Sequence, residues 1–189
     1  MSVQITPTHD AIERLTGRSE ADDPLAAAIR GTRLAVIVTD RREPDDPIVF
    51  ANDAFCALTG YPREEILGRN CRFLQGPDTD PAAVAKVRRA VAEGRDIAVE
   101  VLNYKKNGET FWNGLFISPV RNSAGEVIYF FGSQLDVTRK KQAELALLQA
   151  KGSLEQAVRE RTSDLAQTVE QKTLLLHEVE HRVKNNLQL

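Results

Sequence analysis

The sequence predicts an α+β fold, in which a five-stranded antiparallel sheet carries helices on one face and a long helix follows it. Before Asp136, short apolar runs rich in β-branched and aromatic residues alternate with Gly, Pro, Asn and Asp turns. A well-delimited helix interrupts these runs, which is typical of α+β domains. After Asp136 the chain has no proline and keeps a helical pattern to its end.

The first strand is predicted over residues 34–39, because β-branched side chains dominate that run. Residues 47–51 are its expected hairpin partner. Either Asn52 or Asp53 can cap a short helix that ends before Gly60.

A second helix is predicted over residues 79–92. Thr79 and Asp80 are suitable capping residues, and Pro81 is favoured in a first helical turn. Gly94 lies just past the expected end, where a left-handed glycine commonly terminates a helix.

Three further strands complete the sheet. Residues 97–105 and 110–121 flank Asn107-Gly108, which is the strongest two-residue hairpin signal. Residues 127–137, rich in Tyr, Phe and Val, are the last strand.

Composition narrows the function classes. The chain of 189 residues can form one core plus an appendage, and its hydrophobic content is an ordinary 42%. It has no apolar run long enough to cross a bilayer and no export signal at its start, so we expect a cytoplasmic protein outside the membrane. A net charge of −2 argues against nucleic-acid binding. The two cysteines lack metal-site spacing, so we expect reduced thiols and no zinc site.

Residues 68–75, with the sequence GRNCRFLQ, place a thiol among amides and a guanidinium. Asn70 and Gln75 can hydrogen-bond ring heteroatoms, and Arg72 can form a bidentate contact with a phosphate. The Cys71 thiol can form a covalent bond to an electrophilic ring. These side chains suit an anionic heteroaromatic ligand.

This run resembles the flavin-binding signature of LOV domains, the blue-light-sensing branch of the PAS superfamily, and matching positions extend from Asn52 to Asp136. The resemblance implies a PAS fold, a blue-light receptor and flavin mononucleotide (FMN) as ligand, while a flavin dinucleotide stays open. It implies that Cys71 attacks carbon C4a of the photoexcited flavin and forms an adduct that reverts in darkness. The other cysteine, Cys56, is expected to be an apolar packing residue.

The resemblance also implies which residues contact the flavin. Arg72 and Arg88 would bind its phosphate. Leu115 stands where many relatives carry Phe, a departure expected to alter recovery kinetics without preventing binding. The remaining implied contacts are polar side chains at the ring (Asn70, Gln75, Asn103 and Asn113) and apolar walls (Leu74, Phe73, Leu115 and Val38).

Gln134 is the expected signal relay. When the adduct forms, flavin N5 changes from hydrogen-bond acceptor to donor. A side-chain amide can rotate to keep a hydrogen bond to N5, because it carries both an N–H donor and a carbonyl acceptor. Gln134 lies two residues before Asp136-Val137-Thr138, which resembles the junction where PAS domains pass a signal to an output helix.

Residues 138–189 are predicted to form one long helix or two in series, with Gly152 as a weak point. A helix with so little core of its own needs a partner, so we expect a homodimer through this segment. Polar residues interrupt the apolar stripe, which consists of Leu147, Leu154, Val158, Leu165, Leu175 and Val179.

Residues 174–187, with the sequence LLLHEVEHRVKNNL, resemble the phosphoacceptor box of sensor histidine kinases of the His-Arg-Val-Lys-Asn-Asn subfamily. The resemblance implies that His181 is the phosphoacceptor, and a neutral imidazole is a competent nucleophile for that role. The resemblance implies a longer kinase that passes phosphate from ATP to His181 and on to a response regulator. No ATP-binding motif follows, so this stretch alone is expected to be inactive as a kinase.

The expected organisation has four parts. Residues 1–32 are an extension with a short helix over residues 23–30, and residues 33–137 are the LOV domain. Residues 138–172 are a helical linker, and residues 173–189 begin the phosphoacceptor helix. Two other functions stay open: a PAS sensor that binds flavin for redox or ligand sensing, and a dimerisation module without photochemistry.

Overall fold

The computed structural model describes residues 28–29 and 31–186, and for residues 181, 182 and 184–186 it describes the backbone alone. Most of the helix expected over residues 23–30 therefore lies outside the described residues. The chain divides into two compact units, Met1–Arg139 and Lys140–Leu189.

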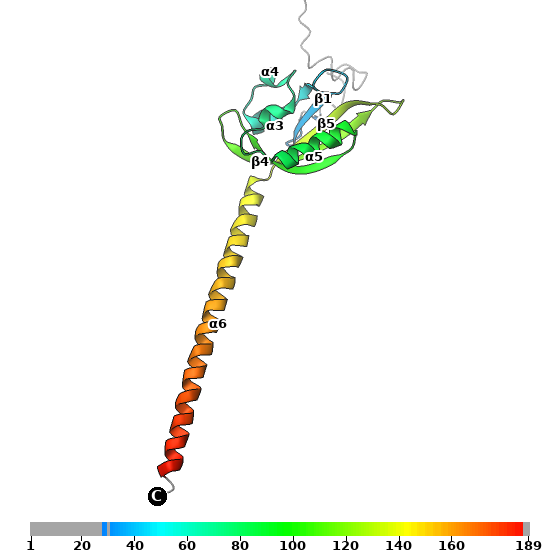
Figure 1. Ribbon diagram of the computed structural model, residues 1–189. Coiled ribbons are helices and arrows are strands. Elements are labelled where there is room, and N and C mark those ends of the chain that lie inside the picture. Colours follow the sequence, from blue (N-terminus) through cyan, green and yellow to red (C-terminus); the bar gives the residue numbers. More distant parts are fainter. Residues whose placement is uncertain (1–27, 30, 187–189) are drawn as a thin grey trace, which may run out of the picture. The chain divides into compact units, whose positions relative to one another are not determined.

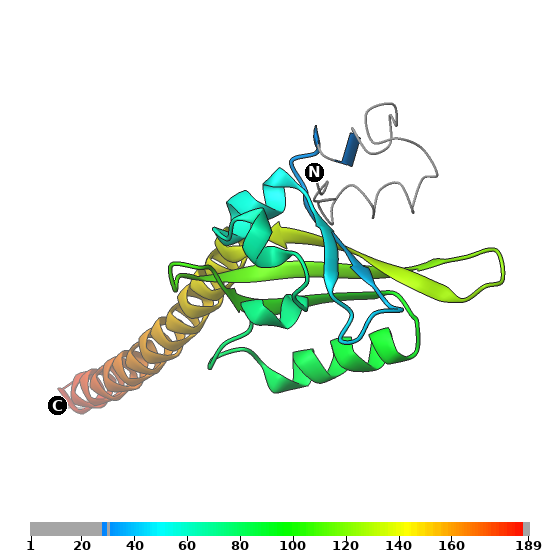
Figure 2. The same cartoon turned by 90° about the horizontal axis from the view of Figure 1, so that it is seen from above.

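The first unit contains a five-stranded antiparallel sheet with the strand order β2-β1-β5-β4-β3 (Figure 1). This order places the first and last strands of the domain side by side. The β4–β5 hairpin extends beyond the other strands, as the view from above shows (Figure 2). The strands are β1 (Ala35–Asp40), β2 (Ile48–Ala51), β3 (Ile97–Tyr104), β4 (Thr110–Arg121) and β5 (Val127–Asp136).

Four short helical elements lie between β2 and β3: α3 (Asp53–Thr59), α4 (Arg63–Ile66), the 3-10 helix η1 (Cys71–Leu74) and α5 (Pro81–Ala92). The side chain of Asn52 caps α3 by accepting a hydrogen bond from Phe55 N, and Gly60 ends it in the left-handed region at φ 75°. Asp80 caps α5, with Pro81 at its first position. The predicted α+β fold is confirmed.

Two helical elements were not predicted. With four residues each, α4 and η1 are too short to show a helical period in the sequence. The Asn107-Gly108 turn is also longer than the two-residue turn predicted, because Gly108 N donates to Lys105 O and Lys105 N donates to Glu109 O. Strand β3 therefore ends at Tyr104.

Alternation along β1 separates two apolar clusters. Ile37 packs on the inner face with Phe55 of α3 and Leu74 of η1. Val38 packs on the outer face with Phe50 and Tyr129. Side chains of a strand alternate between faces, so Ile37 and Val38 lie on opposite faces of the sheet. The inner face is the one that carries Ile37 and packs against the helices.

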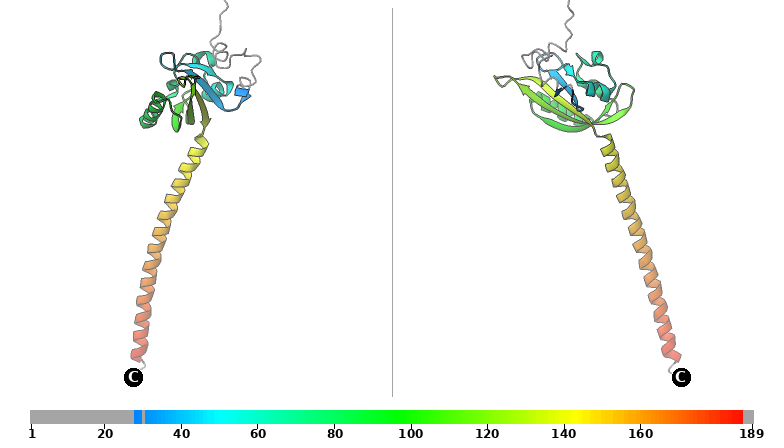
Figure 3. Two further views of the ribbon diagram at one scale, coloured as in Figure 1. Left: turned by 90° about the vertical axis from the view of Figure 1, so that its right-hand side faces the viewer. Right: turned by 180° about the vertical axis from the view of Figure 1, so that it is seen from behind.

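Residues 140–186, the described part of the second unit, belong to one helix, α6 (Thr138–Asn186). The helix is continuous in both views of Figure 3 and passes through Gly152 without a break. Its apolar side chains are exposed, including Leu147 at 72% and Leu165 at 64%. These side chains match the expectation of a partner, and the homodimer stays a prediction. No helix among the described residues is long and apolar enough to cross a membrane.

Candidate functional site

A cavity of about 290 Å³ lies between the inner face of the sheet and the elements α3, η1 and α5. Its size is close to the lower end of the range for small-molecule sites, about 300–1,000 Å³. The cavity brings together ten of the residues expected to contact a ligand, namely Asn70, Cys71, Arg72, Leu74, Gln75, Arg88, Asn103, Asn113, Leu115 and Gln134.

Val38 was wrongly expected to form an apolar wall of this site. It lies on the outer face of β1 with Phe50 and Tyr129, while its neighbours Ile37 and Thr39 line the cavity. The reason is the two-residue period of a strand, which sends adjacent side chains to opposite faces. Phe73 also lies elsewhere, since its ring packs edge-on against Tyr61 with centroids 4.9 Å apart.

Cys71 begins η1 and lines the cavity. Asn70 orients this turn, because its side-chain oxygen accepts a hydrogen bond from Arg72 N at 3.0 Å. Burial raises the pKa of the Cys71 thiol above its ordinary value, so the thiol keeps its proton at neutral pH. Cys56, like Cys71, packs against the inner apolar cluster, but it does not line the cavity.

The inner end of the cavity is formed by three buried amides on adjacent strands. Asn113 Nδ2 donates to Asn103 Oδ1 at 2.9 Å, and these residues and Gln134 are at most 5% exposed. Among the described residues, Asn113 Oδ1 and Gln134 Oε1 are buried without a hydrogen-bond partner. A buried acceptor without a donor is costly, so this end suits a ligand that presents N–H donors.

The strand register explains why these amides converge. Gln134 of β5 pairs with Leu115 of β4. Asn113, two residues before Leu115 on β4, therefore points to the same face as Gln134. Asn113 is also the partner of Val101 on β3, which lines the cavity too.

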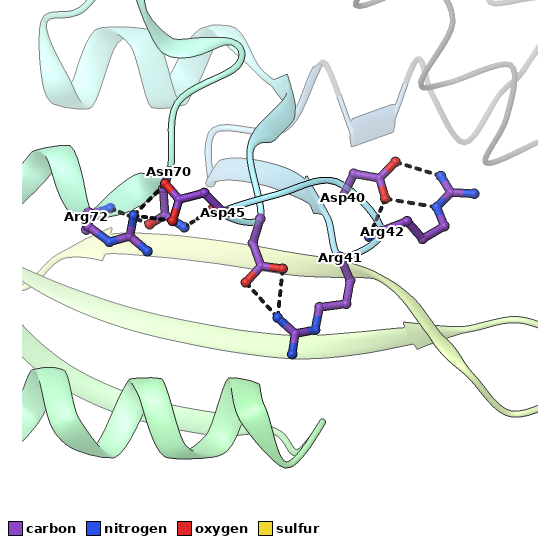
Figure 4. A network of polar contacts seen from close by, with 7 residues as sticks. Asp40, Arg41, Arg42, Asp45, Asn70 and Arg72 are labelled. Atoms are coloured by element: carbon purple, nitrogen blue, oxygen red, sulfur yellow. Dashed lines mark hydrogen bonds and ion pairs between the residues drawn. The ribbon is translucent and has the colours of Figure 1, made fainter.

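The cavity is also lined by three guanidinium groups, those of Arg72 from η1, Arg88 from α5 and Arg41 from the β1–β2 loop. Arg41 N donates to Ile128 O, and Ile128 lies six residues before Gln134 along β5, so this loop lies away from the amides. Arg72 Nη1 lies 2.6 Å from both carboxylate oxygens of Asp45. Arg41 Nη1 lies 3.0 Å from both carboxylate oxygens of Asp46, which also lines the cavity. Figure 4 shows Arg41, Arg72 and Asp45 in this network.

Sequence reasoning missed Arg41, although the period of β1 was a signal for it. Ile37 and Thr39 face the cavity, and Arg41 follows them at the same spacing of two residues. The Arg42 side chain leaves the β1–β2 loop in a different direction from that of Arg41 (Figure 4). It donates to Asp40, and its guanidinium lies 4.7 Å from the centre of the outward-facing Tyr129 ring.

The apolar walls were also only partly anticipated. Val84, Val87 and Val91 of α5 line the cavity at helical spacing, opposite Ile117 and Phe130 of the sheet. The expected phosphoacceptor His181 falls within α6, but its side chain lies outside the described residues.

Residues 33–139 match the family profile of the PAS domain. Among curated proteins, a blue-light-activated histidine kinase of Rhizobium johnstonii is 58% identical over 119 residues, which are 63% of this chain and 34% of that protein. The chain therefore matches only about a third of the length of this relative.

Two examples come from the solved structures that are similar to this chain. One is described as an RNA-binding light-oxygen-voltage receptor, with 44% identity, a TM-score of 0.65, and coverage of 69% of this chain and 37% of the other. The second comes from a study of a flavin analogue and the light-oxygen-voltage domain mechanism, with 43% identity, a TM-score of 0.61, and coverage of 71% of this chain and 99% of the other. The chain therefore belongs to the PAS domain family and, within it, to the light-oxygen-voltage (LOV) domains.

Proposed function

We propose that this chain is the blue-light-sensing part of a histidine kinase and that it binds FMN in the cavity between sheet and helices. The single observation that carries the proposal is the polarity of the cavity, with buried unpartnered amide oxygens at one end and guanidinium groups at the other. A flavin mononucleotide has the matching order of groups, a polar ring edge at one end and a phosphate at the other. The names of similar proteins support the same assignment.

In this proposal the FMN supplies the light absorption and the reactive ring, and the chain supplies position. Asn103, Asn113 and Gln134 hydrogen-bond the ring edge, and Arg72 and Arg88 hold the phosphate. Asn70, Gln75, Leu74 and Leu115 complete the contacts with the flavin.

Cys71 carries the photochemistry in this proposal. If FMN is bound, its illuminated ring would supply an electrophilic carbon, C4a, and Cys71 would supply the sulfur that bonds to it and the proton that N5 takes up. No outside oxidant or reductant would be needed, and Cys71 would recover its proton when the sulfur–carbon bond breaks in darkness. The raised pKa of the Cys71 thiol favours this reaction, because the proton to be transferred is present on the thiol before illumination.

The signal would leave through β5. Gln134 is buried in β5, and the strand ends two residues later at Asp136, whose side chain accepts from Thr138 N at 2.9 Å where α6 begins. A rotated Gln134 amide would change the hydrogen bonds of β5 and thereby bias the packing of α6. Residues 138–172 would pass this change to residues 173–189, where His181 accepts phosphate in the full-length dimeric kinase and delivers it to a response regulator.

An absorption spectrum before and after blue illumination tests the photochemistry. The purified chain should be yellow, bleach under blue light and recover in darkness. Cys71→Ala should retain FMN and lose the bleaching, whereas the control Cys56→Ala should keep both. A Cys71→Ala variant that still bleaches and recovers would refute the assignment. A wild-type chain that binds flavin without bleaching would favour a redox or ligand sensor, and a colourless chain would favour a dimerisation module.

A second measurement separates the relay from the sensor. Gln134→Leu removes the donor and the acceptor at similar volume, so bleaching should persist. Light-induced changes in hydrogen exchange over residues 138–180 should shrink. An undiminished change in α6 would place the relay in another residue.

A further inference from the structure

The β1–β2 loop contributes a cation that the flavin-site assignment above does not use. The Arg41 guanidinium lines the cavity beside Arg72 and Arg88, and its side chain is 41% exposed. Its position is fixed at both ends, because its backbone N donates to Ile128 O at 3.1 Å and its Nη1 contacts both oxygens of Asp46. A guanidinium held in this way loses little further entropy when a ligand binds.

Arg41 keeps donors for a ligand. A guanidinium has five N–H donors, and the side-chain contacts described for Arg41 use Nη1 alone. The Nε and Nη2 donors are thus left for an anionic group in the cavity. Asp46 is the only carboxylate among the described lining residues, and Asp45 pairs with Arg72 beside them. Three guanidinium groups thus stand against two carboxylates, so positive charge still exceeds negative charge at this end.

The loop holds its two carboxylates in a costly conformation. Asp45 and Asp46 have φ angles of 71° and 47°, in the left-handed region that costs residues other than glycine about 1 kcal/mol or more. Contacts with two lining residues stabilise this shape, because Asn70 Nδ2 donates to Asp45 O and Arg72 contacts the Asp45 carboxylate. The strained loop therefore keeps Asp46 beside Arg41 and keeps Arg41 beside the cavity.

We propose that Arg41 is a third phosphate-binding residue, anchored by Asp46, and that it increases the preference of the site for a flavin with a terminal phosphate over one without it. This inference rests on the proposed flavin function. A phosphate monoester carries a charge of about −1.5 to −2 near neutral pH, so a third cation increases its binding and leaves the binding of an uncharged tail unchanged.

The test compares the dissociation constants of FMN and riboflavin, which share the ring and differ in the phosphate. Binding to the whole chain is measured in darkness by the change in flavin fluorescence, at one fixed salt concentration because salt screens such contacts. Arg41→Gln should weaken FMN binding about tenfold, the size expected for one charge-assisted hydrogen bond, and leave riboflavin binding within about twofold. Arg41→Lys should give an intermediate loss.

Arg89→Gln is the matched control. Arg89 is an exposed arginine of α5 next to Arg88 but does not line the cavity, so its removal changes the net charge equally without removing a contact. Its ratio of FMN to riboflavin affinity should equal that of the wild type. Riboflavin binding also reports on folding, because a misfolded variant would lose both ligands.

Two results would overturn the inference while leaving the flavin function intact. Arg41→Gln could retain the wild-type ratio of affinities, or Arg89→Gln could lower that ratio as much as Arg41→Gln does. By contrast, a wild-type chain that binds neither flavin would refute the flavin function itself, and with it the role assigned to Arg41.

Discussion

Replacing Asn52 by Ala should be among the most destabilising single changes in this domain. Asn52 is 0% exposed, and its side chain makes four hydrogen bonds that join three segments. Oδ1 accepts from Val36 N at 2.9 Å and from Phe55 N at 3.0 Å. Nδ2 donates to Leu34 O at 2.8 Å and to Ile29 O at 3.1 Å.

The expected loss follows from these bonds. The bond to Phe55 N is the cap of α3, which is worth about 1 kcal/mol. The other three bonds contribute about 1 kcal/mol each, and their backbone partners would be left without the side chain. The free energy of unfolding should therefore fall by about 4 kcal/mol. For a urea m-value of about 2 kcal/mol/M, the unfolding midpoint should move by about 2 M with the slope unchanged.

Asn122→Ala is a control that separates burial from the number of bonds. The Asn122 side chain makes three hydrogen bonds, to Ala124 N, Glu126 N and Glu126 Oε2, but it does so on an exposed turn where water can replace them. Its loss should stay below about 1 kcal/mol. The reasoning is refuted if urea unfolding gives the two variants equal losses, or if Asn52→Ala loses less than about 1 kcal/mol.

Three further outcomes are expected. Ile37→Ala should weaken FMN binding in a titration, because Ile37 lines the cavity. Val38→Ala should leave FMN affinity unchanged and lower the free energy of unfolding in urea by about 1–2 kcal/mol. Because folding raises the pKa of Cys71, its contribution to stability is present below the ordinary thiol pKa of about 8.5 and is lost as pH rises through the folded-state value. The wild type should thus lose more unfolding free energy than Cys71→Ala between about pH 8 and pH 10, and equal losses would contradict this. Leu165→Glu should lower the molecular mass found by light scattering without changing the flavin spectrum. The measurement is made at tens of micromolar, roughly where a weak coiled coil still pairs, and a monomeric wild type would exclude the dimer.

Local sequence patterns predicted the elements of this fold well. The cap at Asn52, the left-handed Gly60 and the Pro81 start of α5 depend on interactions within a few residues, so they can be read from the chain. The short elements α4 and η1 were not predicted, because four residues are too few to show a helical period of apolar side chains.

The sequence by itself determined the α+β class, the boundaries of most strands and the chemical types of residue at the candidate site. Which of these residues share one cavity was decided only by the tertiary structure. Arg41 and Val38 illustrate the difference, since the first faces the cavity and the second packs on Tyr129 behind it. The physical reason is that the side chains of a strand alternate between the two faces of the sheet. Only the packing against α3, η1 and α5 determines which face lines the cavity.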